Sequence, residues 1–185
     1  MTRDRVVLRS ADPPILVCAD IQARYLGEEC VGGREASRCL ALLELWRAEL
    51  WPVLHLKRIA QAEWFDPASN VTDWVEAFRP RPGEMVFEHP LPSAYSSSCF
   101  AEYMASLRGV CCLLAGCSLD ETVLATAVEG FHRGHHFRVV ADAVTCSKPG
   151  IVDADGYRAS MMSAIGKFAG VEFSSDLIEA AASEA

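Results

Sequence analysis

Short apolar runs alternate with helix-like stretches along most of this chain, and that alternation limits the folds available to it. The run ILVCAD (15–20) is apolar until its last residue, and VCCLLAG (110–116) is apolar throughout. Runs of this kind are typical of strands buried on both faces, as in parallel sheets covered by helices on each side. We therefore predict an α/β fold, a three-layer α/β/α sandwich around a mostly parallel, about six-stranded sheet.

The individual elements follow from the same periodicities. The run 110–116 is the most apolar and is predicted to be a central strand. Residues 59–82 are bounded by prolines and are predicted as a long loop with a short helix near Thr72–Phe78. The predicted strands are residues 15–20, 53–57, 85–89, 110–116, 137–143 and a short last one at 171–173. The predicted helices are residues 34–50, 96–107, 120–133, 155–168 and 175–182.

The size and charge of the chain indicate one folded domain over residues 1–185, with 51% hydrophobic and 23% charged residues. A net charge of −8 disfavours binding to nucleic acid or to an anionic membrane, which needs a basic face. No apolar run approaches the roughly 18 residues that would span a bilayer, and the first residues make a poor signal peptide. We expect a cytoplasmic protein whose ligand is a small molecule.

Eight cysteines raise the possibility of disulfides or a metal site. Several lie within predicted strands or helices, among them Cys18, Cys39, Cys111 and Cys112, where a reduced thiol serves as a small core side chain. No C-x-x-C pair occurs, and no group of cysteines and histidines has zinc-finger spacing. We expect no required disulfide, no metal and no cofactor.

Polar residues that end the predicted strands are the candidate site residues. In open parallel sheets, ligands bind beyond the carboxyl ends of the strands. That rule selects Asp20, Lys57, Arg58, His89 and the turn after Gly116. An acid at the end of a strand also serves simply to cap the following turn, and the turn after Gly116 also suits an ordinary helix start with Asp120 in its first turn.

Four segments in order along the chain nevertheless resemble one family. LVCADIQARYL contains an Asp-x-Gln with an aromatic residue soon after, and PGEMVFEHPLPSAY ends in Ser-Ala-aromatic. GCSLDETVLATA and RGHHFRVVADA complete the set. Together they resemble the isochorismatase-like (cysteine hydrolase) superfamily from about Ile15 to Leu177. The resemblance implies an isochorismatase-like three-layer fold, a small-molecule substrate and a homo-oligomer, a dimer or higher.

The hydrolases of that superfamily share an Asp–Lys–Cys triad, and only its Asp is kept here. Carried over by position, the Asp is Asp20, the Lys position is His89, four residues before Ser93, and the Cys position is Thr122. The expected substrate-binding residues are Lys57 and Arg58 at the end of their strand, Tyr95 in the Ser-Ala-aromatic segment, and Cys117 just after the strand that ends at Gly116. Cys117 lies five residues before Thr122, so its use as a displaced nucleophile is a minor alternative.

The incomplete triad leaves two readings open. A threonine hydroxyl is a far weaker nucleophile than a thiolate, so cysteine-type amidase activity is not expected. Isochorismatases proper cleave a vinyl ether without the cysteine, with an acid protonating the enol carbon; here Asp20 would be that acid, and Lys57 or Arg58 would hold a substrate carboxylate. The alternative is a catalytically inactive member that binds a small molecule or has an oligomeric, structural or regulatory role.

Overall fold

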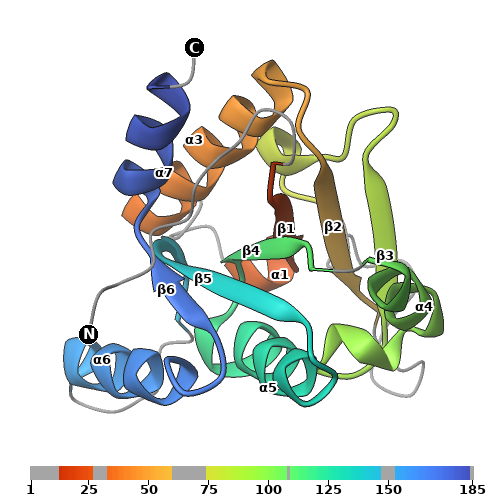
Figure 1. Ribbon diagram of the computed structural model, residues 1–185. Helices are drawn as coiled ribbons and strands as arrows, with labels where there is room; N and C mark the ends of the chain where they lie inside the picture. Colours follow the sequence, from red (N-terminus) through yellow and green to blue (C-terminus); the bar gives the residue numbers. More distant parts are fainter. Residues whose placement is uncertain (1–12, 27–32, 60–73, 108, 147–152, 184–185) are drawn as a thin grey trace.

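Strands β1 (Ile15–Ala19) and β4 (Cys111–Gly116) form the centre of a six-stranded parallel sheet in the computed structural model (Figure 1). The strand order is β3-β2-β1-β4-β5-β6, and every pairing is parallel. The structure describes residues 13–26, 33–59, 74–107, 109–146 and 153–183. The other strands are β2 (Val53–Arg58), β3 (Met85–His89), β5 (His136–Val144) and β6 (Gly170–Glu172). The predicted sheet and the central place of 110–116 are confirmed.

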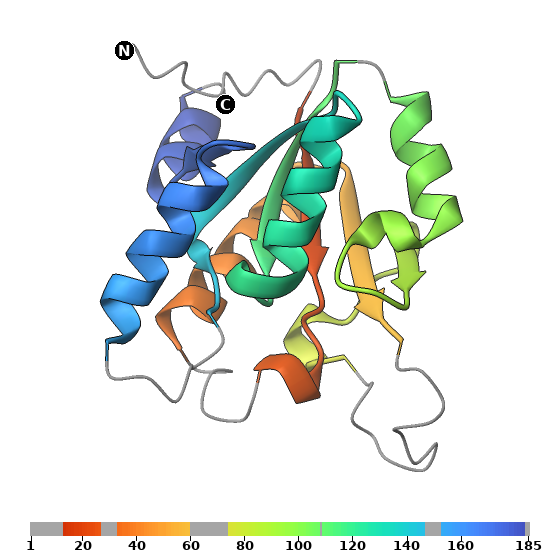
Figure 2. The same cartoon turned by 90° about the horizontal axis from the view of Figure 1, so that it is seen from below.

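Helices cover both faces of this sheet, as Figure 2 shows from a second direction. On one face lie α3 (Arg34–Ala48) and α7 (Ser174–Ala182). On the other face lie α4 (Ser98–Ser106), α5 (Leu124–His132) and α6 (Ala154–Ile165). The predicted α/β/α sandwich is therefore confirmed.

Alternation along the central strand divides the core between the two faces. Leu16 and Cys18 belong to the hydrophobic cluster beneath α3 and α7, whereas Val17 and Ala19 belong to the cluster beneath α4, α5 and α6. Successive side chains of a strand point to opposite faces. A strand with apolar residues at every position is therefore buried on both sides, as the sequence indicated.

Several predicted helices begin differently in the structure. The predicted helix 120–133 opens with a π-helical turn, η5 (Leu119–Val123), before α5. The predicted helix 96–107 is preceded by a separate 3₁₀ turn, η4 (Ala94–Ser96). Of the short helix expected near Thr72–Phe78, only the 3₁₀ turn η3 (Glu76–Phe78) is seen, and 72–73 lie outside the described residues. A short helix α1 (Ala23–Leu26) was not predicted.

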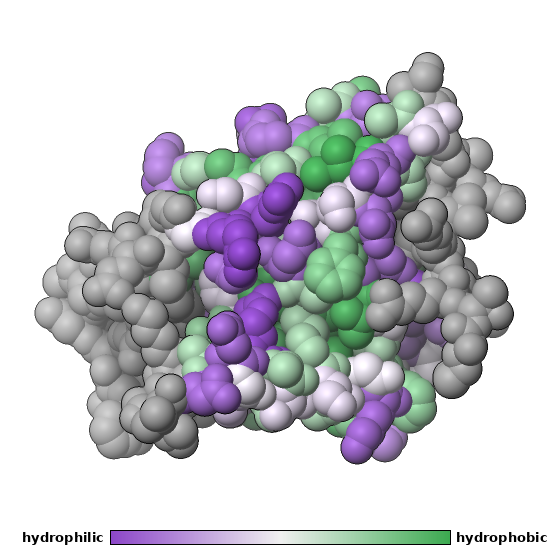
Figure 3. Space-filling model, turned by 90° about the vertical axis from the view of Figure 1, so that its left-hand side faces the viewer, coloured by the Kyte–Doolittle hydropathy of each residue, from purple (hydrophilic) through white to green (hydrophobic). Residues whose placement is uncertain are grey.

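The surface around β6, α6 and α7 carries hydrophilic and hydrophobic side chains side by side (Figure 3). Among the described helices, none is both long and apolar enough to cross a membrane. Seven of the eight cysteines lie in described positions, and each of these seven is a free thiol. Cys18, Cys39 and Cys112 are buried in the core as expected, whereas Cys111 is only partly buried and Cys99 is exposed.

Candidate active site

The carboxyl ends of four neighbouring strands converge on one cluster of polar side chains. Asp20 directly follows β1, Arg58 ends β2, His89 ends β3, and Thr122 lies in η5 after β4. All four are buried, with exposed fractions of 8% for Arg58 and 2% or less for the others. Parallel strands meet with the same ends together, so residues far apart in sequence come into contact here.

The carboxylate of Asp20 is the centre of this cluster. Its Oδ1 lies 2.8 Å from Nε2 of His89, and its Oδ2 accepts a hydrogen bond of 2.6 Å from the hydroxyl of Thr122. Nε of Arg58 lies 3.6 Å from Oδ2. Both carboxylate oxygens therefore face donors, which a buried anion requires.

His89 is held between two acceptors. Its Nδ1 lies 2.7 Å from the carbonyl oxygen of Leu91, which can only accept, so Nδ1 carries a proton. Its Nε2 faces Asp20. A second proton lies between the imidazole and the carboxylate: on the ring it makes an imidazolium beside a carboxylate, and on Oδ1 of Asp20 it makes a neutral carboxylic acid. The two forms differ by one proton transfer along a single hydrogen bond.

Arg58 brings a second cation to the cluster. Its Nη2 donates to Oγ1 of Thr122 at 3.2 Å and to Oε1 of Glu121 at 2.8 Å. Its Nε is buried without a hydrogen-bond partner. The neighbouring Lys57 points to the other face of β2 and pairs with Glu88 at 3.0 Å. Of the two basic residues expected near a substrate, the structure brings only Arg58 to Asp20.

Gln22, the glutamine of the Asp-x-Gln segment, holds the end of β2. The side chain of Gln22 is fully buried, accepts from the backbone N–H of Arg58 at 2.8 Å and donates to its carbonyl oxygen at 3.2 Å. The side-chain amide of Gln22 thus bonds both backbone groups of Arg58, as a residue of a neighbouring strand would, although β1 has already ended. It positions Arg58 relative to Asp20.

The backbone between β4 and η5 approaches β1 very closely. Gly116 has φ +114°, and a Cβ built there would lie 2.3 Å from the carbonyl oxygen of Ala19. The N–H of Cys117 donates to that same oxygen at 2.7 Å. Asp20 itself has φ +45°, in the left-handed region that aspartate tolerates better than most residues. Only glycine at 116 lets the turn bearing Thr122 come within hydrogen-bond distance of Asp20.

The hydroxyl of Thr122 is bonded to two members of the cluster. It donates to Asp20 and accepts from Arg58, and the residue is 1% exposed. A nucleophilic hydroxyl needs a lone pair directed at the substrate and a base to take its proton. Asp20 is placed to take the proton, but the guanidinium of Arg58 draws on the oxygen's lone pairs.

Cys117 and Tyr95 lie apart from the cluster. Cys117 is fully buried in the core beneath α3, close enough to Cys39 to contribute to the raised pKa of that thiol, after the larger effects of a hydrogen bond with Cys18 and of burial. Tyr95 packs in the core of the opposite face, and its hydroxyl meets Nδ1 of His135 at 2.5 Å. The thiol of Cys117 therefore belongs to the core beneath α3, although its backbone N–H bonds to Ala19 beside Asp20, and Tyr95 belongs to the core of the opposite face.

Glu121 is a site residue that the sequence did not reveal. It directly precedes Thr122, and its half-exposed side chain reaches the buried guanidinium of Arg58. An acid in a first helical turn is ordinarily explained by the helix dipole. Only the π-helical winding of η5, which is not visible in the sequence, turns it toward β2.

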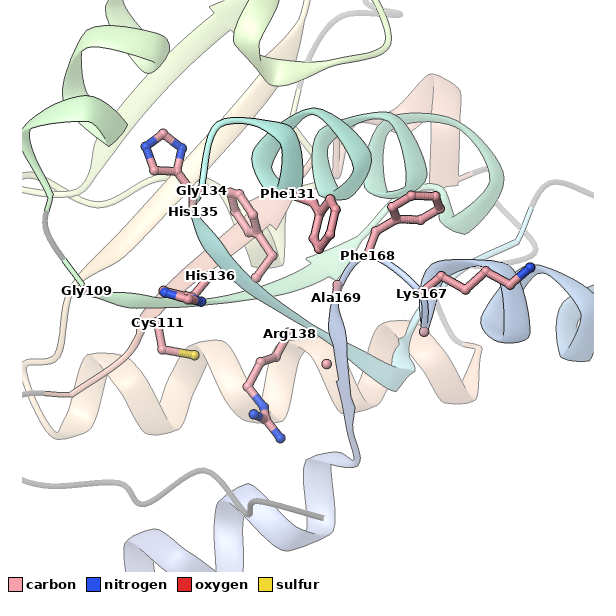
Figure 4. Close-up of a pocket in the computed structure, with 13 residues that line it drawn as sticks. Gly109, Cys111, Phe131, Gly134, His135, His136, Arg138, Lys167, Phe168 and Ala169 are labelled. Atoms are coloured by element: carbon pink, nitrogen blue, oxygen red, sulfur yellow. The ribbon is translucent and has the colours of Figure 1, made fainter. Parts of the chain in front are cut away.

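A separate cavity of about 560 Å³ opens at the other end of the sheet (Figure 4). It lies beside the starts of β4, β5 and β6, and the labelled rings of Phe131 and Phe168 meet edge to face at 5.7 Å. None of the four clustered residues lines it. No group of three or more histidine, cysteine or acidic side chains in the described segments is arranged to hold a metal ion.

The relation to known proteins agrees with this geometry. A family model described as the isochorismatase domain matches residues 14–171, most of the chain. The chain belongs to the isochorismatase family. A search of the curated proteins finds no match.

Solved structures of isochorismatase-family proteins share the fold. A protein from Chromobacterium violaceum described as a hydrolase of this family superposes with a TM-score of 0.80 at 23% identity, covering 95% of this chain and 97% of its own. A cysteine hydrolase from Pseudomonas syringae pv. phaseolicola gives 0.80 at 15% identity, covering 98% and 97%. N-carbamoylsarcosine amidase from Thermoplasma acidophilum gives 0.67 at 20% identity, covering 87% and 96%. These likenesses show the isochorismatase fold.

Proposed function

We propose that this chain is a hydrolase that acts on a small carboxylate-bearing metabolite without a covalent intermediate, with Asp20 as the general acid. The hydrogen bond of 2.8 Å between His89 and Asp20 carries the proposal, because it connects a proton source to a carboxylate at the carboxyl ends of the strands. The family membership supports a hydrolase. The substrate itself is inferred from the chemistry of the cluster.

The reaction begins with one proton transfer. The imidazolium of His89 passes its Nε2 proton to Oδ1 of Asp20, which gives a neutral imidazole and a carboxylic acid. Asp20 then protonates the CH₂ carbon of a carboxylate-bearing vinyl ether, and the positive charge moves to the ether-bearing carbon. Water adds to that carbon, and the hemiketal collapses to an alcohol and a keto acid. One proton of the water returns to the Asp20–His89 pair, and the other goes to the departing oxygen to give the alcohol.

Arg58 has the binding role in this scheme. Its guanidinium lies beside both Asp20 and Thr122, so a ligand carboxylate bound to it would be held next to the general acid. Arginine suits carboxylates because its planar N–H groups match the two carboxylate oxygens. Thr122 keeps Asp20 in place by its hydrogen bond rather than attacking the substrate.

The amidase chemistry named for the Thermoplasma relative is not carried over. The superfamily's amidases need a thiolate, and Thr122 stands at that position with its hydroxyl bonded to Asp20 and Arg58. We therefore expect a carboxylate-bearing vinyl ether to be cleaved and the amide of matched size to be left intact.

The test compares three single variants against the wild-type protein. Asp20→Asn removes the proton donor and should lower kcat by about 10²-fold or more, the usual contribution of a general acid. Thr122→Ala should keep kcat within roughly 10-fold, since only one hydrogen bond to Asp20 is lost. Glu88→Gln, on an exposed side chain beside His89, is the control and should not change kcat. Equal loss in Thr122→Ala and Asp20→Asn would contradict a mechanism without a nucleophile.

A catalytically inactive, ligand-binding member is the second candidate. The observation that favours it is the closed state of the cluster, in which both oxygens of Asp20 are bonded and the residue is 2% exposed. Such a protein would bind small carboxylates without turning them over. Absence of turnover on vinyl ethers, esters and amides, together with measurable ligand binding, would favour this candidate. We expect a cytoplasmic homo-oligomer in either case.

A further inference from the structure

A half-exposed carboxylate is bonded to the buried guanidinium of the cluster. The side chain of Glu121 is 46% exposed, whereas that of Arg58 is 9% exposed, and Oε1 of the first lies 2.8 Å from Nη2 of the second. The contact therefore reaches from the surface into the cluster. It joins a carboxylate that touches solvent to the groups around Asp20.

The charges of the described cluster explain why this contact forms. Asp20 and His89 already balance each other through their hydrogen bond, so the charge of Arg58 needs another partner. Nε of Arg58 makes no hydrogen bond, and it lies 3.6 Å from Oδ2 of Asp20. Glu121 supplies the missing negative charge from outside. A buried guanidinium without such a partner would be strongly destabilised.

We infer that Glu121 is a built-in substitute for the carboxylate of the ligand, bound to Arg58 in the free protein and displaced when the ligand binds. This rests on the proposed function in taking the cluster as the ligand site. Because one carboxylate replaces another, the charge around Arg58 stays the same. A neutral ligand that displaced Glu121 would leave the guanidinium unpaired, so the exchange selects for ligands with a carboxylate.

Displacement of Glu121 requires little work. Its half-exposed side chain can turn into solvent without burying any group, and the ligand carboxylate takes its place on Arg58, so the buried guanidinium is never left unpaired. Glu121 also lies in the π-helical turn η5, next to Thr122. Single π-helical turns are frequent at functional sites. A ligand carboxylate bound in place of Glu121 would therefore accept from Nη2 of Arg58, the atom that Glu121 holds.

The experiment measures binding and not turnover, with benzoate as the carboxylate probe and benzamide as its neutral match. Titration calorimetry on the wild-type protein should show weak binding of benzoate and none of benzamide. Glu121→Gln frees Arg58 from its internal partner and should lower the Kd for benzoate roughly two- to five-fold. Arg58→Met should abolish benzoate binding.

The matched control is Glu88→Gln, which removes one negative charge at the same end of the sheet but contacts Lys57 instead of Arg58. It should leave the Kd for benzoate unchanged, which excludes a general effect of net charge. Equal benzoate affinity in wild-type protein and Glu121→Gln would overturn the inference, and so would benzamide binding as tightly as benzoate. If Arg58→Met does not fold, the comparison of Glu121→Gln with Glu88→Gln still tests whether Glu121 competes with the ligand for Arg58.

The two proposals fail in different ways. Tighter benzoate binding by Glu121→Gln, with no hydrolysis of any vinyl ether, would support the exchange of carboxylates and contradict the proposed hydrolase activity. Hydrolysis of a vinyl ether, with a Kd for benzoate that Glu121→Gln does not change, would support the hydrolase activity and contradict the displacement of Glu121 by the ligand. A crystal structure with benzoate on Arg58 and Glu121 turned into solvent would support the inference directly.

Discussion

Nε2 of His89 lies 2.8 Å from Oδ1 of Asp20, although the strands that these residues end are not neighbours in the sheet. β2 lies between β1 and β3, so the hydrogen bond passes over the end of β2. Arg58, the last residue of β2, pairs in register with His89 and extends its side chain to Asp20. One carboxylate therefore joins the ends of three strands.

Breaking this contact should destabilise the fold. His89→Leu fills a similar space without a charge and leaves Asp20 with one unbonded oxygen in a fully buried position. Loss of one partner from a buried ion pair costs about 3–5 kcal/mol in free energy of unfolding. Urea denaturation of wild-type protein and His89→Leu measures the difference. A loss below roughly 1 kcal/mol would mean that the contact is not a buried ion pair.

Thr122 should not form a covalent adduct. Its hydroxyl proton is donated to Asp20, one of its lone pairs accepts from Arg58 and the residue is 1% exposed, so the oxygen is poorly placed to attack a ligand. Intact-mass spectrometry after treatment with an electrophilic ester or amide probe should show no added mass on Thr122. Thr122→Cys provides the positive control, because its thiol should be labelled. An adduct on Cys117 in the wild-type protein would instead support a displaced cysteine mechanism.

The ion pair between Glu84 and Arg47, with the buried His55 beside it, makes the stability of the fold depend on pH. Burial alone would raise the pKa of Glu84, but hydrogen bonds from Arg47, from the backbone N–H of Arg81 and from His55 outweigh burial and lower the pKa from 4.5 to about 2. A depressed carboxyl pKa stabilises the fold above pH 4.5, and that contribution is lost as the pH falls from 4.5 toward 2.

The variant Glu84→Gln should therefore be less stable than the wild-type protein at pH 7, and the difference should shrink as the pH falls below 4.5.

Burial lowers the pKa of His55 below 6.5, so the folded state resists protonation of this ring, and the free energy of unfolding should also fall on acidification, beginning near pH 6.5. Thermal unfolding of both proteins between pH 3 and pH 8, roughly in steps of one unit, measures both effects. A stability difference that stayed constant down to pH 3 would contradict the assigned ion pair.

Gly116→Ala should disrupt the site and the fold together. The added Cβ would lie 2.3 Å from the carbonyl oxygen of Ala19, and φ +114° is a conformation that alanine rarely adopts. Strain and overpacking together should lower the free energy of unfolding by roughly 2–4 kcal/mol. Gly134→Ala is the matched control, since its φ of +76° is also positive but no atom lies near its Cβ. A similar loss in both variants would assign the effect to φ alone.

The sequence predicted the sheet, the two helical layers and the positions that meet at the strand ends, because those depend on apolar periodicity and on the rule for parallel sheets. Asp20, His89 and Thr122 lie together for that reason. The roles of Lys57 and Arg58 could not be separated, since a shift of one residue along a strand reverses the face on which a side chain lies. Glu121 was missed because the π-helical turn that directs it depends on tertiary contacts and has no pattern of its own.

The absence of a side chain at Gly116 has a consequence for how this fold can change its chemistry. The distance between Asp20 and the residue at 122 is set by a backbone contact with β1, not by the identity of either side chain. Position 122 can therefore exchange one small side chain for another while the scaffold that aims it at Asp20 stays in place. One amino-acid substitution at position 122 is therefore enough to remove or introduce a nucleophile beside Asp20 while the fold stays the same.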